Sequence, residues 1–206
     1  MKVLLINGSP KANGNTAFAL TQMAEVFAEQ GIETETIQVG NQIIRGCIGC
    51  GSCYKTGKCV FNDLVNEVAA KLEEADGMVV GSPVYYASPN GTLISFLDRL
   101  FYSTGKMNKR MKVGASIVVA RRGGCTAAFD VLNKYFTISE MPVASSSYWN
   151  MIHGGVPGDA QQDAEGIRTM RNLAKDMSFL MKSISMGKDA LGLPTPEPKA
   201  FTNFIR

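Results

Sequence analysis

The sequence has very little histidine, because His153 is the only one in 206 residues. A site built from several histidine ligands is therefore excluded, and a nucleophile–histidine pair could use only this residue. The nucleophile elbow G-x-S-x-G is absent, and so are the Walker sequence G-x-x-x-x-G-K-[ST] and the dinucleotide fingerprint G-x-G-x-x-G. Hydrolase chemistry and the two commonest phosphate-binding motifs consequently have no support.

Strong charge and long apolar runs are also missing. The 21 basic and 18 acidic residues give a net charge of +3, and the basic residues are scattered, so nucleic acid is not an expected partner. No apolar run approaches the roughly 20 residues that span a bilayer. The apolar stretch after Met1-Lys2 is too short for a signal peptide. We therefore expect a cytoplasmic protein without membrane partners.

What the chain does contain is an alternation of strand and helix patterns over a composition that is 45% hydrophobic, which suits one globular domain. Near-continuous apolar strands separated by helices indicate a parallel sheet with helices on both faces. We expect a single flavodoxin-like, doubly wound α/β domain over residues 1–186, with five strands in the order 2-1-3-4-5, and an extended tail at 187–206. The predicted strands are 2–7, 33–39, 77–81, 113–120 and a weaker 142–148, and the predicted helices are 16–30, 63–74, 92–102, 125–138 and 163–186.

A small polar loop follows the first predicted strand. Its sequence, G-S-P-K-A-N-G-N-T at residues 8–16, leads directly into a helix. The N–H groups of a helix's first turn lack intrahelical partners, and the helix dipole adds positive charge there. Ser9, Asn15 and Thr16 add donors, and two glycines allow close approach of the backbone. The loop fits either a phosphate cradle or an ordinary βα turn with an Asn/Thr cap.

A second polar loop, S-P-V-Y-Y-A-S-P-N-G at residues 82–91, ends the third predicted strand. In the predicted order, strands 1 and 3 flank the point where the order reverses, and such sheets bind ligands outside the carboxyl ends of those strands. Two tyrosines and two prolines at that point suit the walls of a site for a flat heteroaromatic ring. Tyr85 and Tyr86 equally fit loop side chains that cover the sheet edge.

Three motifs now combine: G-S-P-K-x-x-G-N-T at 8–16, S-P-V-Y at 82–85 and F-L-D-R at 96–99. Together they resemble the NAD(P)H-dependent FMN reductase family, flavodoxin-like oxidoreductases that include the iron–sulfur flavoproteins. The resemblance runs from residue 1 to about residue 180. One departure is Ser95, which stands where relatives often carry a lysine, so any role of that charge is absent here.

The resemblance implies FMN as cofactor, NAD(P)H as co-substrate and a homodimer or homotetramer. Because the flavin carries the redox chemistry, no side chain is expected to serve as catalytic acid, base or nucleophile. The phosphate would be held by the loop at 8–16, and the ring would lie against the loop at 82–91. The implied FMN-binding residues are Ser9, Lys11, Asn15, Thr16, Pro83, Val84, Tyr85, Tyr86, Ser88, Gly123 and Gly124.

Charged residues near these loops have two interpretations each. Arg121, followed by Arg122, ends the fourth predicted strand, and a cation at the pyrimidine edge of a flavin would stabilise the negative charge that develops on reduction. Tandem arginines at a strand end are also often simply solvated, so Arg121 is a candidate FMN-binding residue with that alternative open. Asp98 and Arg99, on a predicted helix, are expected to form ion pairs that orient it.

Four cysteines occupy a glycine-rich loop between residues 40 and 62 with the spacing C-x2-C-x2-C-x5-C. Four thiolates that converge on one centre suit a [4Fe–4S] cluster or zinc, and the x2, x2 run is more typical of a cluster than of paired zinc knuckles. The motif also resembles the compact cysteine motif of the iron–sulfur flavoproteins. Free or oxidised thiols remain an alternative. The candidate metal ligands are Cys47, Cys50, Cys53 and Cys59; Cys125 is expected to be a small buried hydrophobe.

These observations predict an FMN-dependent oxidoreductase that passes hydride from NAD(P)H to flavin and on to an acceptor. Quinones, nitro or azo compounds, flavin and ferric species all fit as acceptors. The alternative is an iron–sulfur flavoprotein that carries electrons between redox partners, and a third possibility is a nucleotide-binding regulatory domain without turnover. Fast oxidation of NAD(P)H with a small acceptor would distinguish a reductase from a carrier.

Overall fold

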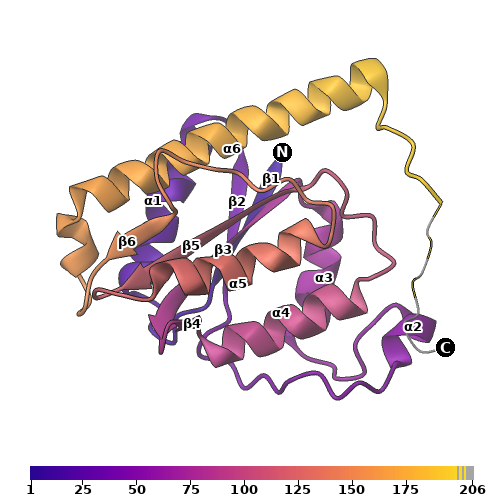
Figure 1. The fold of residues 1–206 in the computed structure, drawn as a ribbon, viewed down its shortest axis with the longest axis horizontal. Coiled ribbons are helices and arrows are strands. Elements are labelled where there is room, and N and C mark those ends of the chain that lie inside the picture. Colours follow the sequence, from indigo (N-terminus) through magenta and orange to yellow (C-terminus); the bar gives the residue numbers. More distant parts are fainter. Residues whose placement is uncertain (199, 201, 203–206) are drawn as a thin grey trace.

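The computed structural model describes residues 1–198, 200 and 202, and its centre is a parallel sheet (Figure 1). The strand order is β2-β1-β3-β5-β6, which confirms the predicted order 2-1-3-4-5 of the five parallel strands. A short β4 pairs antiparallel with the end of β3 and lies off this path. The strands are β1 (Lys2–Asn7), β2 (Glu33–Gln38), β3 (Gly77–Tyr85), β4 (Ser88–Pro89), β5 (Val113–Ala120) and β6 (Met151–His153).

Helices cover both faces of this sheet, as Figure 1 shows. The reason is visible in β1, where successive side chains alternate between faces. Val3 and Leu5 pack with α1 (Asn15–Glu29) and α6 (Ala164–Leu191). Leu4 and Ile6 pack in a second core with the other helices. Those helices are α3 (Leu64–Glu74), α4 (Gly91–Ser103) and α5 (Cys125–Thr137).

All four of these β1 side chains are fully buried, and a buried aliphatic side chain contributes about 1.5–3 kcal/mol. Helices therefore cover both faces of the sheet at β1, which is why the sequence of this strand is a continuous apolar run. Among the described residues, no helix combines the length and apolar character that crossing a bilayer requires.

The predicted fifth strand at 142–148 is wrong in position. Only Val143 forms a bridge there, with Gly114, whereas the ladder pairs Met151–His153 with Val118–Ala120. From Val143 to Met151 the chain advances eight residues while its partner strand advances four, from Gly114 to Val118, so four extra residues bulge outward. The bulge carries the half-exposed Tyr148 and Trp149.

Three smaller differences bear on the site. The third strand continues beyond the predicted residue 81 to Tyr85 and turns back as β4. The long loop contains a short helix, α2 (Ser52–Thr56). The last helix continues to Leu191, so residues 187–191 of the predicted tail are helical, and part of that tail lies outside the described residues.

Candidate functional site

The loop between β1 and α1 presents the start of a helix at the carboxyl edge of the sheet. Gly14 is the N-cap residue, and within the described part of the chain no side chain caps α1. The N–H groups of the first turn therefore keep their capacity to bind an anion. Ser9 and Thr16 are buried here, at 6% and 2% exposure, while Lys11 is exposed.

Asn7 and Gln38, which the sequence did not single out, hold this loop in place. The Asn7 side chain accepts a hydrogen bond from the Ser9 N–H at 3.0 Å and donates one to Gln38 at 2.7 Å. Gln38 in turn donates to the Ser9 carbonyl oxygen. Gly40 lies so close that a Cβ on it would stand 2.2 Å from the carbonyl oxygen of Gly8. The loop is thus held by polar contacts from the ends of β1 and β2.

The side chain of Asn15 makes contacts that the sequence did not indicate. Its amide nitrogen donates to the Val156 carbonyl oxygen at 2.9 Å, and its amide oxygen accepts from the N–H groups of Gly158 and Ala160 at 3.1 and 3.4 Å. The side chain is therefore engaged with the loop after β6. Its backbone N–H, at the first position of α1, has no intrahelical partner and stays available to an anion.

The same loop is braced by Asp159. Its carboxylate accepts hydrogen bonds from the backbone N–H groups of Gly155 and Val156, both at 2.9 Å. These two hydrogen bonds, from Val156 first, lower the pKa of Asp159 from its usual value because they stabilise the charged carboxylate. The segment that Asn15 contacts is consequently a turn stabilised by its own hydrogen bonds.

The second predicted loop is a hairpin turn with unusual backbone angles. Tyr86 and Ala87 have φ values of 50° and 58°, in the left-handed region that non-glycine residues rarely adopt. Tyr86 is fully exposed and Tyr85 is 46% exposed, so neither ring covers the sheet edge. Such strain in a loop at a switch point is a feature of ligand sites. The exposed Tyr85 favours the role of ring wall over that of packing.

The loop after β5 contacts this hairpin. Gly124 has a φ of 91°, and a Cβ on it would stand 2.9 Å from Cα of Ala87, so both the backbone angle and the close approach require glycine. Arg121 and Arg122 are exposed beside it, and a Cβ on Gly155 would lie 3.4 Å from Cγ of Arg121. The structure therefore brings the segments that contain the predicted FMN-binding residues to one sheet edge.

The four cysteines line one cavity between the long loop and α4. Cys47 and Cys50 are exposed, and Cys53 and Cys59 are partly buried. Within the described residues, no three potential metal-ligating side chains already converge as they would around a bound ion. Four cysteines that line a common cavity nevertheless form a donor set whose chemistry fits a thiolate-ligated cluster or zinc. Cys125 lies apart, 4% exposed, and burial raises the pKa of its thiol, as expected for a structural cysteine.

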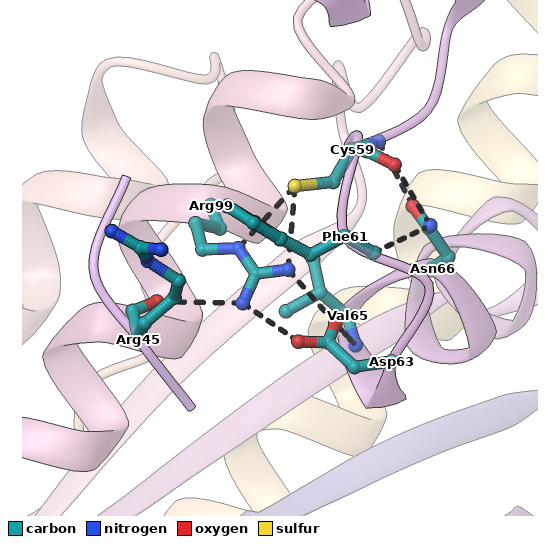
Figure 2. Close-up of polar contacts among 7 residues, drawn as sticks. All are labelled: Arg45, Cys59, Phe61, Asp63, Val65, Asn66 and Arg99. Carbon is teal, nitrogen blue, oxygen red and sulfur yellow. Dashed lines mark hydrogen bonds and ion pairs between the residues drawn. The ribbon is translucent and has the colours of Figure 1, made fainter. Parts of the chain in front are cut away.

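A buried arginine contacts the fourth cysteine (Figure 2). Arg99, on α4, is 1% exposed, and its Nε and Nη2 each lie 3.3 Å from the Cys59 sulfur. The other side of the guanidinium pairs with both carboxylate oxygens of Asp63 at 2.8 Å. Burial alone would lower the pKa of Arg99, but the hydrogen bonds to Asp63 and Cys59 raise it overall. The predicted ion pair of Arg99 is confirmed, whereas Asp98 accepts a hydrogen bond from the Tyr135 hydroxyl instead.

The predicted start of a helix at Asp63 is also confirmed. The Asp63 side chain accepts a hydrogen bond from the Val65 N–H at 3.2 Å and caps α3. Sequence analysis could place Asp63 and Arg99 on their helices. Their pairing and the contact with Cys59 join segments 36 and 40 residues apart. A local sequence pattern cannot predict contacts between segments so far apart in the chain.

The fold and the sequence both define a class of protein. The fold matches a flavodoxin from the domain Archaea with a TM-score of 0.59 at 15% identity, over 88% of this chain and 99% of that one. The family model "NADPH-dependent FMN reductase" matches residues 1–155. The chain belongs to this family and is an oxidoreductase with a flavodoxin-like fold.

Two curated relatives match nearly full length. An iron-sulfur flavoprotein of Methanocaldococcus jannaschii is 36% identical over 191 residues, which cover 89% of this chain and 99% of the relative. An iron-sulfur flavoprotein of Methanosarcina thermophila is 30% identical over 193 residues, covering 92% and 100%. The family resemblance found from the motifs is confirmed.

Proposed function

We propose that this protein is an iron–sulfur flavoprotein that carries electrons between redox partners through FMN at the sheet edge and a cluster at the cysteine loop. The observation that carries the proposal is that Cys47, Cys50, Cys53 and Cys59 line one cavity, with the buried Arg99 against the last of them. Two near-full-length relatives bear the name iron-sulfur flavoprotein, which supports the same conclusion.

The phosphate of FMN would be held at the start of α1. Ser9 and Thr16 contribute hydroxyl groups, Lys11 a positive charge, and the uncapped first turn its N–H groups. Because Asn7 and Gln38 fix the loop without a ligand, little ordering remains to oppose binding. Asn15 contributes its backbone and anchors the neighbouring loop with its side chain.

The ring would lie at the hairpin. Pro83, Val84, Tyr85, Tyr86 and Ser88 belong to one β-hairpin, and Gly124, which follows Gly123, lies against it. FMN supplies the chemistry, since it accepts hydride or single electrons. The chain supplies position, an apolar wall and a nearby positive charge from Arg121, which favours an electron-rich ring.

The four cysteine sulfurs would hold the cluster, which supplies one-electron transfer. The backbone of Cys59 is held by Asn66 on α3. Its N–H donates to the Asn66 side chain at 2.9 Å, and the Asn66 amide donates back to the Cys59 carbonyl oxygen at 3.0 Å. The exposed Cys47 and Cys50 bring the loop to the surface, where a protein partner has access.

A second candidate function is an NAD(P)H-dependent reductase that passes hydride to a small acceptor. It is favoured by the family model, which covers residues 1–155 and therefore includes both FMN loops and the cysteine loop. In this case the cysteines are thiols, and turnover does not depend on them.

The two functions are separated by the electron donor. Protein purified without oxygen is mixed either with NADPH or NADH, or with a chemically reduced low-potential iron–sulfur protein, and loss of flavin absorbance is followed by stopped flow. We expect fast reduction by the protein donor, slow reduction by the nicotinamides, and slower protein-driven reduction in Cys50→Ser. Fast nicotinamide oxidation that Cys50→Ser leaves unchanged would overturn the carrier proposal and favour the reductase.

A further inference from the structure

Arg99 uses every donor it has, although it is almost completely buried. A guanidinium carries five N–H donors. Nη1 donates to the Arg45 carbonyl oxygen at 3.4 Å and to Asp63, Nη2 to Asp63 and Cys59, and Nε to Cys59, which together make five hydrogen bonds. Figure 2 shows Arg99 with its acceptors Arg45, Asp63 and Cys59. The side chain is therefore fixed in one orientation.

Four of the five hydrogen bonds go to two acceptors, the Asp63 carboxylate and the Cys59 sulfur. The guanidinium's end-on fork meets the Asp63 carboxylate, a pairing in which both partners are charged. Its side-on fork sends two N–H groups to a single sulfur, at 3.3 Å each. A neutral thiol is a weak acceptor, whereas an anionic sulfur is a strong one. The geometry around Cys59 is thus that of a site built for a negatively charged sulfur.

The packing around Arg99 excludes alternative positions. Its guanidinium carbon lies 5.0 Å from the centroid of the Phe61 ring, and that of Arg45 lies 4.9 Å from the same centroid. Asn66 clamps the Cys59 backbone. Sulfur and guanidinium are consequently both held, one by α3 and one by α4.

We propose that Arg99 is a positioning residue that holds the Cys59 sulfur as a cluster ligand and sets the reduction potential of the cluster. This inference rests on the proposed function. It gives the arginine of the F-L-D-R motif a role toward the cysteine loop in addition to helix orientation.

The sign of the effect follows from charge. Adding one electron makes a thiolate-ligated cluster more negative by one unit. N–H···S hydrogen bonds and a nearby positive charge stabilise the more negative form, so Arg99 raises the potential. Asp63 is a negative charge on the far side of the same guanidinium and acts in the opposite direction. Removing one partner or the other should therefore shift the potential in opposite directions.

The test is a redox titration of holoprotein followed by electron paramagnetic resonance, on the wild type and on Arg99→Gln, Arg99→Lys and Asp63→Asn. We expect Arg99→Gln to shift the one-electron equilibrium at least tenfold toward the oxidised form, a fall of about 59 mV. Arg99→Lys keeps the charge but loses the fork, so a smaller fall is expected. Asp63→Asn keeps the N-cap and should raise the potential.

Asp63→Asn is the matched control because it breaks the same ion pair as Arg99→Gln. A merely structural role predicts equal behaviour of the two variants, with loss of iron or shifts of the same sign. Unchanged potentials, or shifts of the same sign, would overturn the proposal. Should Arg99→Gln fail to fold, Asp63→Asn decides, because only a rise in potential agrees with the proposal.

Failure of this inference is distinguishable from failure of the proposed function. Wild-type protein that binds FMN but no iron would remove the cluster from the proposed function. Wild-type protein that holds iron, with potentials that do not respond to these substitutions, would remove only the role of Arg99.

Discussion

The side chain of Asn15, at the first position of α1, donates a hydrogen bond to the carbonyl oxygen of Val156 at 2.9 Å. The two residues are 141 positions apart, and the contact ties the start of the first helix to the loop after the last strand. A residue that the motif assigns to phosphate binding thus also holds a second loop beside the proposed phosphate site.

Replacement of Asn15 by alanine should weaken FMN binding and the fold together. The substitution leaves the Gly158 and Ala160 N–H groups and the Val156 carbonyl oxygen without this partner, at a cost of about 0.5–1.5 kcal/mol in unfolding free energy because water can reach most of these groups. We expect the dissociation constant for FMN, measured by quenching of flavin fluorescence, to rise about tenfold. Thr21→Ala, an exposed position on the same helix, is the control. Unchanged FMN affinity in Asn15→Ala would contradict this role.

Gly124 and Gly123 make a matched pair for the loop after β5. Gly124→Ala forces a side chain onto a φ of 91° and into Ala87, so unfolding free energy should fall by about 1–3 kcal/mol. Gly123 has open space around its Cβ position and no positive φ, so Gly123→Ala should change stability by less than about 0.5 kcal/mol. Urea denaturation of the flavin-free proteins measures both. Equal stability of the two variants would show that the contact with Ala87 is unimportant.

Glu35 makes stability depend on acid pH. It pairs with Lys2 at 2.7 Å and with Lys71, and the hydrogen bond from Lys2, followed by that from Lys71, lowers its pKa below the usual 4.5. A carboxyl group with a lowered folded-state pKa stabilises the fold above its unfolded-state pKa, and that contribution disappears as the pH falls through the folded-state pKa. Because the pairs are partly exposed, the contribution is about 1 kcal/mol or less.

Glu35→Gln should therefore lower the unfolding free energy near neutral pH and leave it closer to that of the wild type at about pH 3. Urea denaturation at the two pH values gives the comparison. A difference between variant and wild type that stays constant over this range would mean that Glu35 stabilises the strand through packing alone.

Tyr54 clamps the cysteine-bearing helix α2 onto α4. Its hydroxyl donates to the Tyr102 hydroxyl at 2.7 Å, the rings meet edge to face, and its carbonyl oxygen accepts from Lys106. Tyr54→Ala removes a ring contact and a hydrogen bond worth about 1–2 kcal/mol. We expect iron to pass to a chelator at least about fivefold faster, with FMN content unchanged. Tyr148→Ala, at a half-exposed tyrosine on the outer bulge, is the control, and equal release rates in all three proteins would refute the clamp.

The inner strands β1, β3 and β5 were predictable from sequence because most of their residues are buried, on both faces of the sheet. Val113–Ala120 is apolar throughout and its predicted limits match β5. The fifth strand was misplaced because the weak strand pattern at 142–148 pairs with β5 only at Val143, and the pairing of Met151–His153 depends on tertiary contacts. The hairpin at Tyr86 and Ala87 carries none of the Asn-Gly signals that mark such turns, so it left no sequence signature.

The candidate site was predictable in part for a similar reason. Motifs report which residues a loop contains, so the loops at 8–16 and 82–91 could be selected. They do not report which side chains bind other parts of the protein, as Asn15 binds the loop after β6. Nor do they report which residues hold a loop in place, as Asn7 and Gln38 do for the loop at 8–16. Arg99 was identified as an ion-pairing residue. Its contact with Cys59 could not be predicted, because Cys59 lies 40 residues earlier, in the loop before α3.

The content of iron, acid-labile sulfide and FMN in protein purified without oxygen tests the central claim most directly. We predict about one FMN and about four irons per chain, with a broad absorbance shoulder beyond the flavin bands. Cys50→Ser should lose the iron and keep the flavin. Protein that binds FMN but holds no iron would contradict the iron–sulfur flavoprotein proposal, and protein that takes up no FMN at all would contradict the flavin site itself.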